Sequence, residues 1–135
     1  MGQFGVILLD THALLWLISE PAKLSQSATA VIEQTRLQKQ ELVIVDISLL
    51  EVATLVRKGR IGIQIDLETL FDEVQSRFVV KAITGRACMK TLELPTNYPK
   101  DPADRIIGAT ALAEGIPLIT ADENIRRAKA FRTIW

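Results

Sequence analysis

Four acidic residues stand where predicted strands end or predicted helices begin: Asp10, Glu51, Asp104 and Asp122. Asp10 closes an apolar run, Glu51 lies in the first turn of a helix, and Asp122 follows a strand ending at Thr120. In an open parallel sheet, the carboxyl ends of the strands share one edge, and the following helices begin there. We therefore expect these acids to meet if their strands are neighbours. The placement of Asp104 depends on the loop before its helix.

Helix capping is an alternative explanation for each acid taken singly. Ser48 and Glu51 have the spacing of a capping box, and residues 101–104 (DPAD) repeat the design with proline at the first helical position. Asp122 is a natural N-cap, favoured there by the helix dipole. Asp10 is different, because it interrupts the apolar segment 6–18, where a charge is costly unless it is compensated. A cation explains Asp10 more readily than a cap does.

Clustered carboxylates favour a hard divalent ion. Two of them about 4 Å apart repel by about 4 kcal/mol at an effective dielectric of 20. Such a group takes up protons or attracts a cation, and oxygen-only ligands suit Mg²⁺ or Mn²⁺. One cysteine and one histidine cannot build a usual zinc site, and no Gly-rich phosphate loop occurs. Because a bound ion can generate hydroxide and stabilise the attacking and leaving oxygens at phosphorus, phosphodiester hydrolysis is the expected reaction class.

The elements that must position these acids alternate along the chain. Apolar runs predict strands over residues 6–10, 42–46, 78–80 and 116–120, with a last edge strand at 133–134. Helical patterns lie between and after them, at residues 13–18, 25–39, 48–58, a segment opened by Asp66, 84–92, 102–114 and 122–130. This order predicts an α/β sandwich around a largely parallel sheet, with residues 1–135 as one domain.

Composition limits the other classes. The 16 basic and 16 acidic residues cancel, so RNA contact must come from bound metal and local basic clusters, at residues 57–60 and 126–132. The apolar stretch 6–18 is too short to cross a bilayer and carries Asp10, and the single Cys88 fits a reducing compartment. We expect a soluble cytoplasmic protein that does not contact membrane.

Five blocks in order resemble the PIN-domain family, specifically toxins of the VapC type. They are residues 8–17 (LLDTHALLWL), 47–53 (ISLLEVA), 58–61 (KGRI), 101–111 (DPADRIIGATA) and 117–122 (PLITAD). The resemblance implies a PIN-like three-layer sandwich and an Mg²⁺- or Mn²⁺-dependent endoribonuclease that acts on single-stranded or structured RNA. Its acids match Asp10, Glu51, Asp104 and Asp122, as both metal ligands and catalytic residues. Such toxins typically have a small antitoxin partner and often form homodimers.

The same resemblance suggests supporting roles. Thr11 is placed among the supporting residues. Asp101 is expected to orient the loop or a metal-bound water, and the Thr120 hydroxyl is expected to contact a metal ligand rather than the metal. Arg105 either steers phosphate or, more simply, forms a structural salt bridge with Asp101. Many relatives carry a histidine where this chain has Pro99, which is expected to affect loop geometry or substrate contact.

Two questions remain open from the sequence. His12 is expected to cap or pack, whereas Trp16 and Leu15 belong either to the core or to an apolar groove for an antitoxin helix. The competing function is a catalytically inactive binding module for protein or RNA, in which the acids only cap helices. That alternative predicts no stabilisation by divalent ions.

Overall fold

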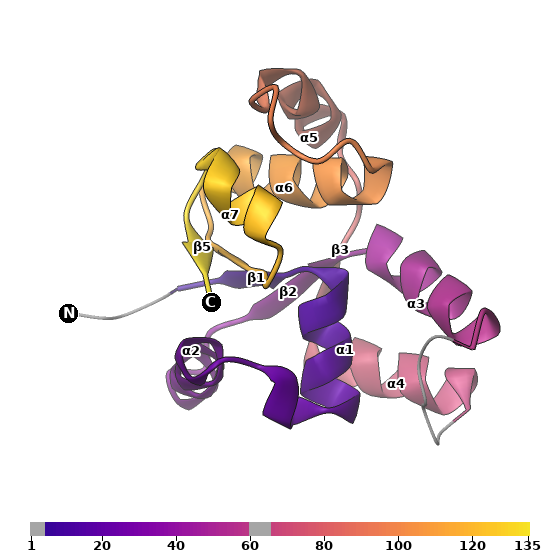
Figure 1. Cartoon of the computed structure of the whole chain (residues 1–135). Helices are drawn as coiled ribbons and strands as arrows, with labels where there is room; N and C mark the ends of the chain where they lie inside the picture. Colours follow the sequence, from indigo (N-terminus) through magenta and orange to yellow (C-terminus); the bar gives the residue numbers. More distant parts are fainter. Residues whose placement is uncertain (1–4, 60–65) are drawn as a thin grey trace.

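The computed structural model describes residues 5–59 and 66–135 and is built on one parallel sheet (Figure 1). Arg60 and Ile61, which belong to a predicted basic cluster and a family block, lie outside these ranges. The strand order is β3-β2-β1-β4-β5, and every pairing is parallel. The strands are β1 (Ile7–Leu9), β2 (Leu42–Val45), β3 (Val79–Lys81), β4 (Leu118–Ile119) and β5 (Thr133–Ile134). The predicted edge strand at 133–134 is confirmed.

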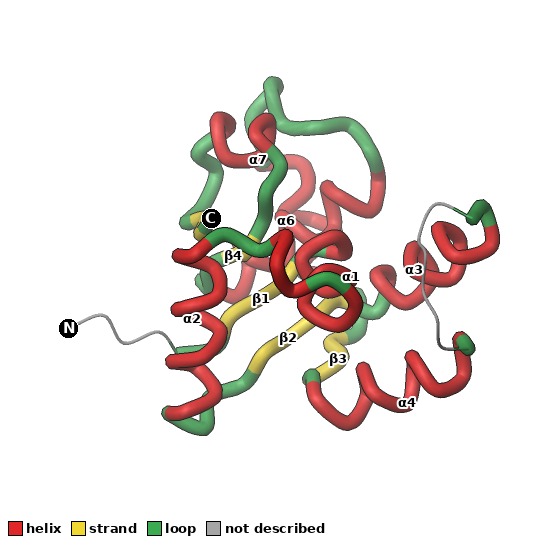
Figure 2. The backbone as a smooth tube through the Cα atoms, turned by 60° about the horizontal axis from the view of Figure 1, so that its bottom comes forward, coloured by secondary structure: helices red, strands yellow, loops and turns green. Residues whose placement is uncertain are grey.

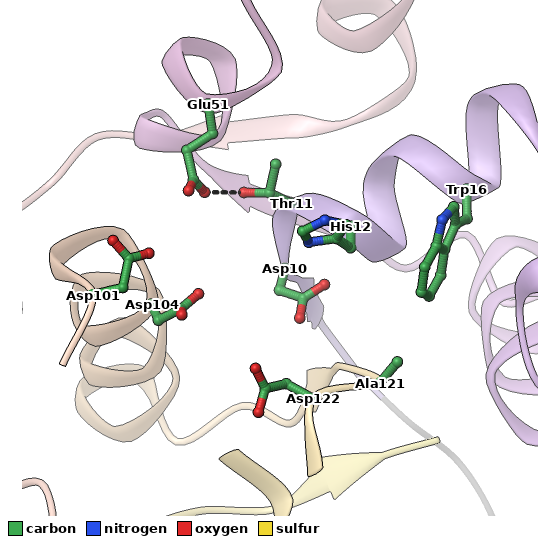
Figure 3. Close-up of a pocket in the computed structure, with 9 residues that line it drawn as sticks. All are labelled: Asp10, Thr11, His12, Trp16, Glu51, Asp101, Asp104, Ala121 and Asp122. Carbon is green, nitrogen blue, oxygen red and sulfur yellow. Dashed lines mark hydrogen bonds between the residues drawn. The ribbon is translucent and has the colours of Figure 1, made fainter. Parts of the chain in front are cut away.

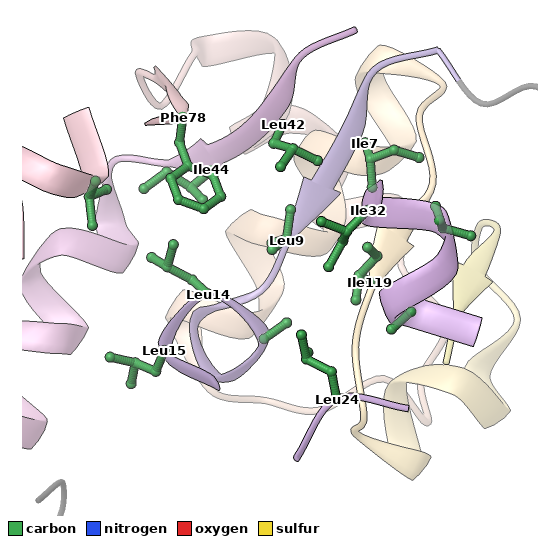
Figure 4. Close-up of a cluster of buried hydrophobic side chains, with 14 of the residues drawn as sticks. Ile7, Leu9, Leu14, Leu15, Leu24, Ile32, Leu42, Ile44, Phe78 and Ile119 are labelled. Carbon is green, nitrogen blue, oxygen red and sulfur yellow. The ribbon is translucent and has the colours of Figure 1, made fainter. Parts of the chain in front are cut away.

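Four helices contribute to the larger core on one face of the sheet. They are α1 (Thr11–Ser19), α2 (Gln26–Leu37), α3 (Ile47–Arg57) and α4 (Leu67–Arg77). Ile7 and Leu9 of β1 point into this core, where Leu14 of α1 and Ile32 of α2 cover them (Figure 4). A short 3₁₀ turn at Pro21–Lys23, which the sequence did not predict, links α1 to α2.

The opposite face is covered by α6 (Pro102–Glu114) and α7 (Glu123–Ala128) (Figure 2). Helix α5 (Gly85–Lys90), followed by a 3₁₀ turn at Thr91–Glu93, packs on α6 on the side away from the sheet (Figure 1). Leu8 of β1 packs here with Ile107 of α6 and Ile125 of α7. Successive residues of a strand point to opposite faces, so the apolar run 7–9 fills both cores. The predicted three-layer α/β sandwich with a parallel sheet is confirmed.

The order of the strands creates a switch point beside β1. The chain passes from β1 to β2 and β3 on one side, then returns to place β4 on the other side of β1. The β1–β2 connection runs through α1 and α2, whereas the β3–β4 connection runs through α5 and α6 on the opposite face. Crossovers on opposite faces leave a crevice at the carboxyl ends of the two strands between which the order reverses, here β1 and β4. Asp10 directly follows β1 at this crevice.

Capping residues next in the sequence mark the ends of most helices. Ser25, Asp66 and Thr84 each accept a hydrogen bond from the backbone N–H three residues later, as N-caps. Gly115 ends α6 with φ of 65°, a left-handed conformation that glycine adopts without strain. No helix in the described ranges is long and apolar enough to cross a membrane.

Gly108 of α6 leaves room for the buried Tyr98, and we predict that Gly108→Ala is strongly destabilising. A Cβ at position 108 would overlap the Tyr98 hydroxyl and lie 2.7 Å from its Cζ. Overpacking of this kind costs about 1–3 kcal/mol, which chemical denaturation would measure. Gly85→Ala is the matched control, because a Cβ there meets nothing within 4 Å. Equal stabilities of the two variants would contradict the prediction.

Candidate active site

The acids predicted from the sequence surround one cavity of about 300 Å³ at the switch point (Figure 3). Asp10 comes from the end of β1, Glu51 from α3, Asp104 from α6 and Asp122 from the start of α7. The other lining residues are Thr11, His12, Trp16, Asp101 and Ala121. Segments more than 110 residues apart in the chain, those of Asp10 and Asp122, thus share one cavity.

Asp10 is both buried and a helix cap. Its side chain is 8% exposed, and its Oδ1 accepts a 2.9 Å hydrogen bond from the Ala13 backbone N–H. The expectation that a cation, rather than a cap, explains Asp10 was therefore incomplete. Burial raises the pKa of Asp10, and the Thr120 hydroxyl and the Ala13 N–H partly offset this effect. A neighbouring cation would stabilise the charged form of such a carboxyl.

Glu51 is held by Thr11 and does not form the predicted capping box. Helix α3 begins at Ile47, one residue earlier than expected, so Ser48 lies inside the first turn and is fully buried. Thr11 Oγ1 donates to Glu51 Oε1 at 2.5 Å and lies 2.9 Å from Ser48 Oγ. Because a threonine hydroxyl has a single proton, Ser48 must donate to Thr11. The Ser48–Thr11–Glu51 chain fixes the carboxylate at the edge of the cavity.

Asp104 carries the clearest electrostatic signature of the cluster. The pKa of Asp104 is raised to about 7, most strongly by burial and then by the nearby carboxylates of Asp101, Glu51, Asp122 and Asp10, in that order of strength. Asp101 stands at the N-cap position of α6, yet its side chain makes no capping hydrogen bond. The capping explanation for Asp101 is therefore wrong, whereas Pro102 does occupy the first turn as predicted. The Asp101 carboxylate is exposed at the cavity.

Asp122 does cap its helix, as the alternative explanation predicted. Its Oδ1 accepts from the backbone N–H groups of Asn124 at 2.8 Å and Ile125 at 3.0 Å. The Asp122 N–H in turn donates to Thr120 Oγ1 at 3.1 Å. Since that bond uses an acceptor lone pair of Thr120, the hydroxyl proton remains available to Asp10. Thr120 thus links the two acids that follow β1 and β4.

Arg105 has a different partner from the one predicted. Its guanidinium donates to the Thr91 carbonyl at 2.8 Å and the Pro99 carbonyl at 3.5 Å. In residues 5–59 and 66–135 it forms no ion pair with Asp101. The salt-bridge prediction was wrong because the loop before α6 folds its carbonyls over the arginine. Arg105 anchors this loop, and Pro99 contributes a carbonyl to the anchor.

Tyr98 was missed by the sequence analysis. It is 1% exposed, and its hydroxyl donates to the Asp104 backbone carbonyl at 3.1 Å. The Tyr98 ring packs against Gly108 and Phe131 and so fixes the first turn of α6. A glycine inside a helical pattern often has a packing reason, and Gly108 was the signal that could have revealed this contact.

The donor set fits a hydrated divalent ion. All the acidic groups offer oxygen, and no lysine or arginine is among the described residues that line the cavity. Within the described chain, no three acidic, histidine or cysteine side chains are arranged to hold one ion together. Mg²⁺ keeps several waters and commonly takes one or two carboxylates, so a pair of these acids is sufficient. The mutual repulsion that raises the Asp104 pKa would be relieved by such an ion.

The fold and the cavity define an α/β protein with a carboxylate site at the switch point of a parallel sheet. The family model described as PIN domain matches residues 7–130. The sequence is 34% identical over 131 residues to Ribonuclease VapC22 of Mycobacterium tuberculosis (strain ATCC 25618 / H37Rv), covering 96% of this chain and 98% of that protein. The chain belongs to the PIN-domain family.

Solved structures agree on the fold. VapBC2 from Rickettsia felis, bound to a DNA fragment from its promoter, matches with a TM-score of 0.73 at 18% identity, covering 95% of this chain and 96% of that one. DNA-bound VapBC from Salmonella typhimurium matches with a TM-score of 0.70 at 18% identity over 97% of both chains. At this identity the likeness supports the architecture alone.

Proposed function

We propose that this chain is a VapC-type ribonuclease toxin that hydrolyses RNA phosphodiester bonds, with Mg²⁺ or Mn²⁺ held among Asp10, Glu51, Asp104 and Asp122. The observation that carries the proposal is the convergence of these acids and Asp101 on one cavity, where burial and the neighbouring carboxylates together raise the pKa of Asp104 to about 7. Similarity to a curated ribonuclease over nearly the whole chain supports the reaction and the substrate class.

The chain's own side chains have separate tasks in this mechanism. A divalent ion, when bound, supplies Lewis acidity at phosphorus and lowers the pKa of water. Thr11 keeps Glu51 turned toward the cavity, and Thr120 links Asp10 to Asp122. Asp101 makes no capping bond, so its exposed carboxylate is available to orient the attacking water. Arg105 and Tyr98 hold the loop and the helix turn that carry Asp101 and Asp104.

The acidic wall explains why a metal ion would be essential. An RNA phosphate entering the cavity meets carboxylates from four elements and no lysine or arginine among the described lining residues. The negative phosphate and the carboxylates repel each other, and this repulsion is strongest where water is excluded. A cation between phosphate and carboxylates would turn that repulsion into attraction.

We propose that the biological partner is an antitoxin protein. Besides the two VapBC structures above, a toxin–antitoxin complex from Klebsiella pneumoniae has a similar fold. We further propose that residues 1–135 act as a single PIN-like domain, that the toxin forms a homodimer, and that it acts on cytoplasmic RNA.

Cleavage of RNA by the purified chain tests the proposal. We expect cleavage with Mg²⁺ or Mn²⁺, its loss when a chelator is added, and its return when Mn²⁺ is restored in excess. Gel analysis of total RNA measures all three states. Cleavage that persists in the chelator would contradict metal dependence. If neither ion gives cleavage, the inactive binding module is favoured, since Asp10 and Asp122 do cap helices.

A further inference from the structure

We propose that Trp16, with His12 beside it, is a stacking platform for an unpaired base of the RNA substrate next to the scissile phosphate. This inference rests on the proposed ribonuclease function and deepens it, because it names the side chains that would hold an unpaired base beside the scissile phosphate. The carboxylate site would hold the phosphate, and the aromatic platform would hold a neighbouring base.

The two rings lie on the same side of α1, one helical turn apart. His12 and Trp16 are spaced i and i+4, and their ring centroids are 5.9 Å apart, tilted by 55°. His12 is exposed, whereas Trp16 is half-buried and rests on Trp135, with centroids 5.7 Å apart. In Figure 3 both rings lie across the cavity from Asp101 and Asp104. Trp135 thus supports an indole that remains partly accessible.

A second cavity begins where the carboxylate cavity ends. It has a volume of about 370 Å³, and His12 and Trp16 line both cavities. Its other lining residues are Leu15, Ser19, Glu20, Lys23 and Leu55. The volume is within the range of small-molecule sites, about 300–1,000 Å³. Lys23, which also lines this cavity, offers a cation to the RNA backbone, although it pairs with Glu20 at 3.1 Å.

Charge favours a base over a phosphate at this position. The carboxylate cavity repels the RNA backbone, and the chain has no net charge to attract it. Binding energy must therefore come partly from uncharged surface, and a base can stack on an aromatic face whatever its identity. A duplex keeps its bases stacked inside, so only unpaired RNA could use the platform.

A third cavity, on the other side of Glu51, is less suitable for a base. It has a volume of about 390 Å³ and shares Glu51, Asp101 and His12 with neighbouring cavities. The described residues that line it include no tryptophan, tyrosine or phenylalanine. The two acids and Lys58 in its lining fit an RNA backbone held by an ion better than a stacked base. Because Trp16 lines the second cavity and not the third, we place the base in the second cavity.

The test compares Trp16→Leu with Trp16→Phe, because leucine removes the aromatic face and phenylalanine keeps one. The probes are a labelled oligouridylate of about eight nucleotides and an abasic ribose-phosphate chain of the same length. Fluorescence anisotropy is measured in Ca²⁺, which takes carboxylate oxygens, and a gel checks that the probes stay intact. We expect Trp16→Leu to weaken oligouridylate binding by about 10- to 100-fold, the loss of one stacked base, with abasic binding unchanged.

Phenylalanine should restore most of the oligouridylate affinity. His12→Ala, at an exposed position, should weaken the same probe by a smaller factor and serves if Trp16→Leu does not fold. Leu92→Ala is the control, because Leu92 is 86% exposed and lines none of these three cavities. The proposal is overturned if Trp16→Leu binds oligouridylate as tightly as wild type, or loses both probes equally. If Trp16→Leu binds oligouridylate as tightly as wild type, the second cavity is better explained as a contact site for a protein partner.

The two proposals fail in different ways. Loss of the ribonuclease function would appear as no RNA cleavage with Mn²⁺, with the difference between the two probes retained. Loss of the stacking platform would appear as equal affinity for the two probes, with cleavage retained.

Discussion

Asp10→Asn is expected to lower RNA cleavage by at least about 100-fold without weakening the fold. Changing a side chain that only supports a metal ligand typically costs 10- to 100-fold, so a direct ligand should cost at least that much. Asparagine keeps the Oδ1 that accepts from the Ala13 N–H, and it is a good N-cap. It removes the negative charge of a carboxyl whose pKa is raised by burial, and it replaces the second carboxylate oxygen with an amide NH2 group that cannot bind a metal ion. Initial cleavage rates in Mn²⁺ measure the effect.

Asp66→Asn is the matched control for this substitution. Asp66 caps α4 with the same geometry, accepting from the Thr69 N–H at 2.8 Å, but it is exposed and does not line the carboxylate cavity. We expect its cleavage rate to equal that of wild type. If Asp10→Asn also cleaves RNA at the wild-type rate, Asp10 is only a helix cap and the proposed mechanism is wrong.

Asp104→Asn is expected to have opposite effects on stability with and without metal. The pKa of Asp104 is raised from 3.8 to about 7, first by burial and then by Asp101 and the other carboxylates. Between those values the native state binds more protons than the unfolded state, so the free energy of unfolding falls as pH rises. In chelator at pH above 7, the variant should therefore melt at a higher temperature than wild type. Near pH 4 the difference should disappear.

Adding Mn²⁺ should reverse this order. A ligand at 100 times its Kd stabilises the native state by about 2.7 kcal/mol, and wild type should gain close to that amount. The variant should gain less, because it lacks one carboxylate of the cluster. Thermal melts at matched pH, with and without Mn²⁺, measure both effects. Asp72→Asn, at an exposed position of α4, should follow wild type throughout. If Mn²⁺ does not stabilise wild type, the acids do not hold a divalent ion and the inactive binding module is favoured.

The sequence predicted the elements of the fold because their signals are local. Apolar runs marked the strands, and Ser25, Asp66 and Gly115 marked helix ends within one or two residues. Capping and left-handed turns depend on the identity of nearby residues alone. The three-residue strand β1 is apolar throughout because helices cover both of its faces.

The candidate site was predicted only in part. Acids at strand ends indicated the edge where they would meet, because parallel strands share that edge. Two partners were wrong. Glu51 pairs with Thr11 rather than Ser48, and Arg105 binds carbonyls rather than Asp101. Both errors have one cause: the real partner is 40 positions away for Glu51 and 14 for Arg105, so no local pattern could indicate it.

By itself, the sequence determined the α/β alternation, the ends of most helices and the set of acids capable of binding a metal. The tertiary structure decided the strand order that places β1 beside β4, and with it the meeting of Asp10 and Asp122. It also decided the contact of Tyr98 with Gly108 and the shared wall formed by Trp16. Local backbone preference sets which elements form, whereas neighbours across the sheet are chosen by burial of the whole chain's apolar surface.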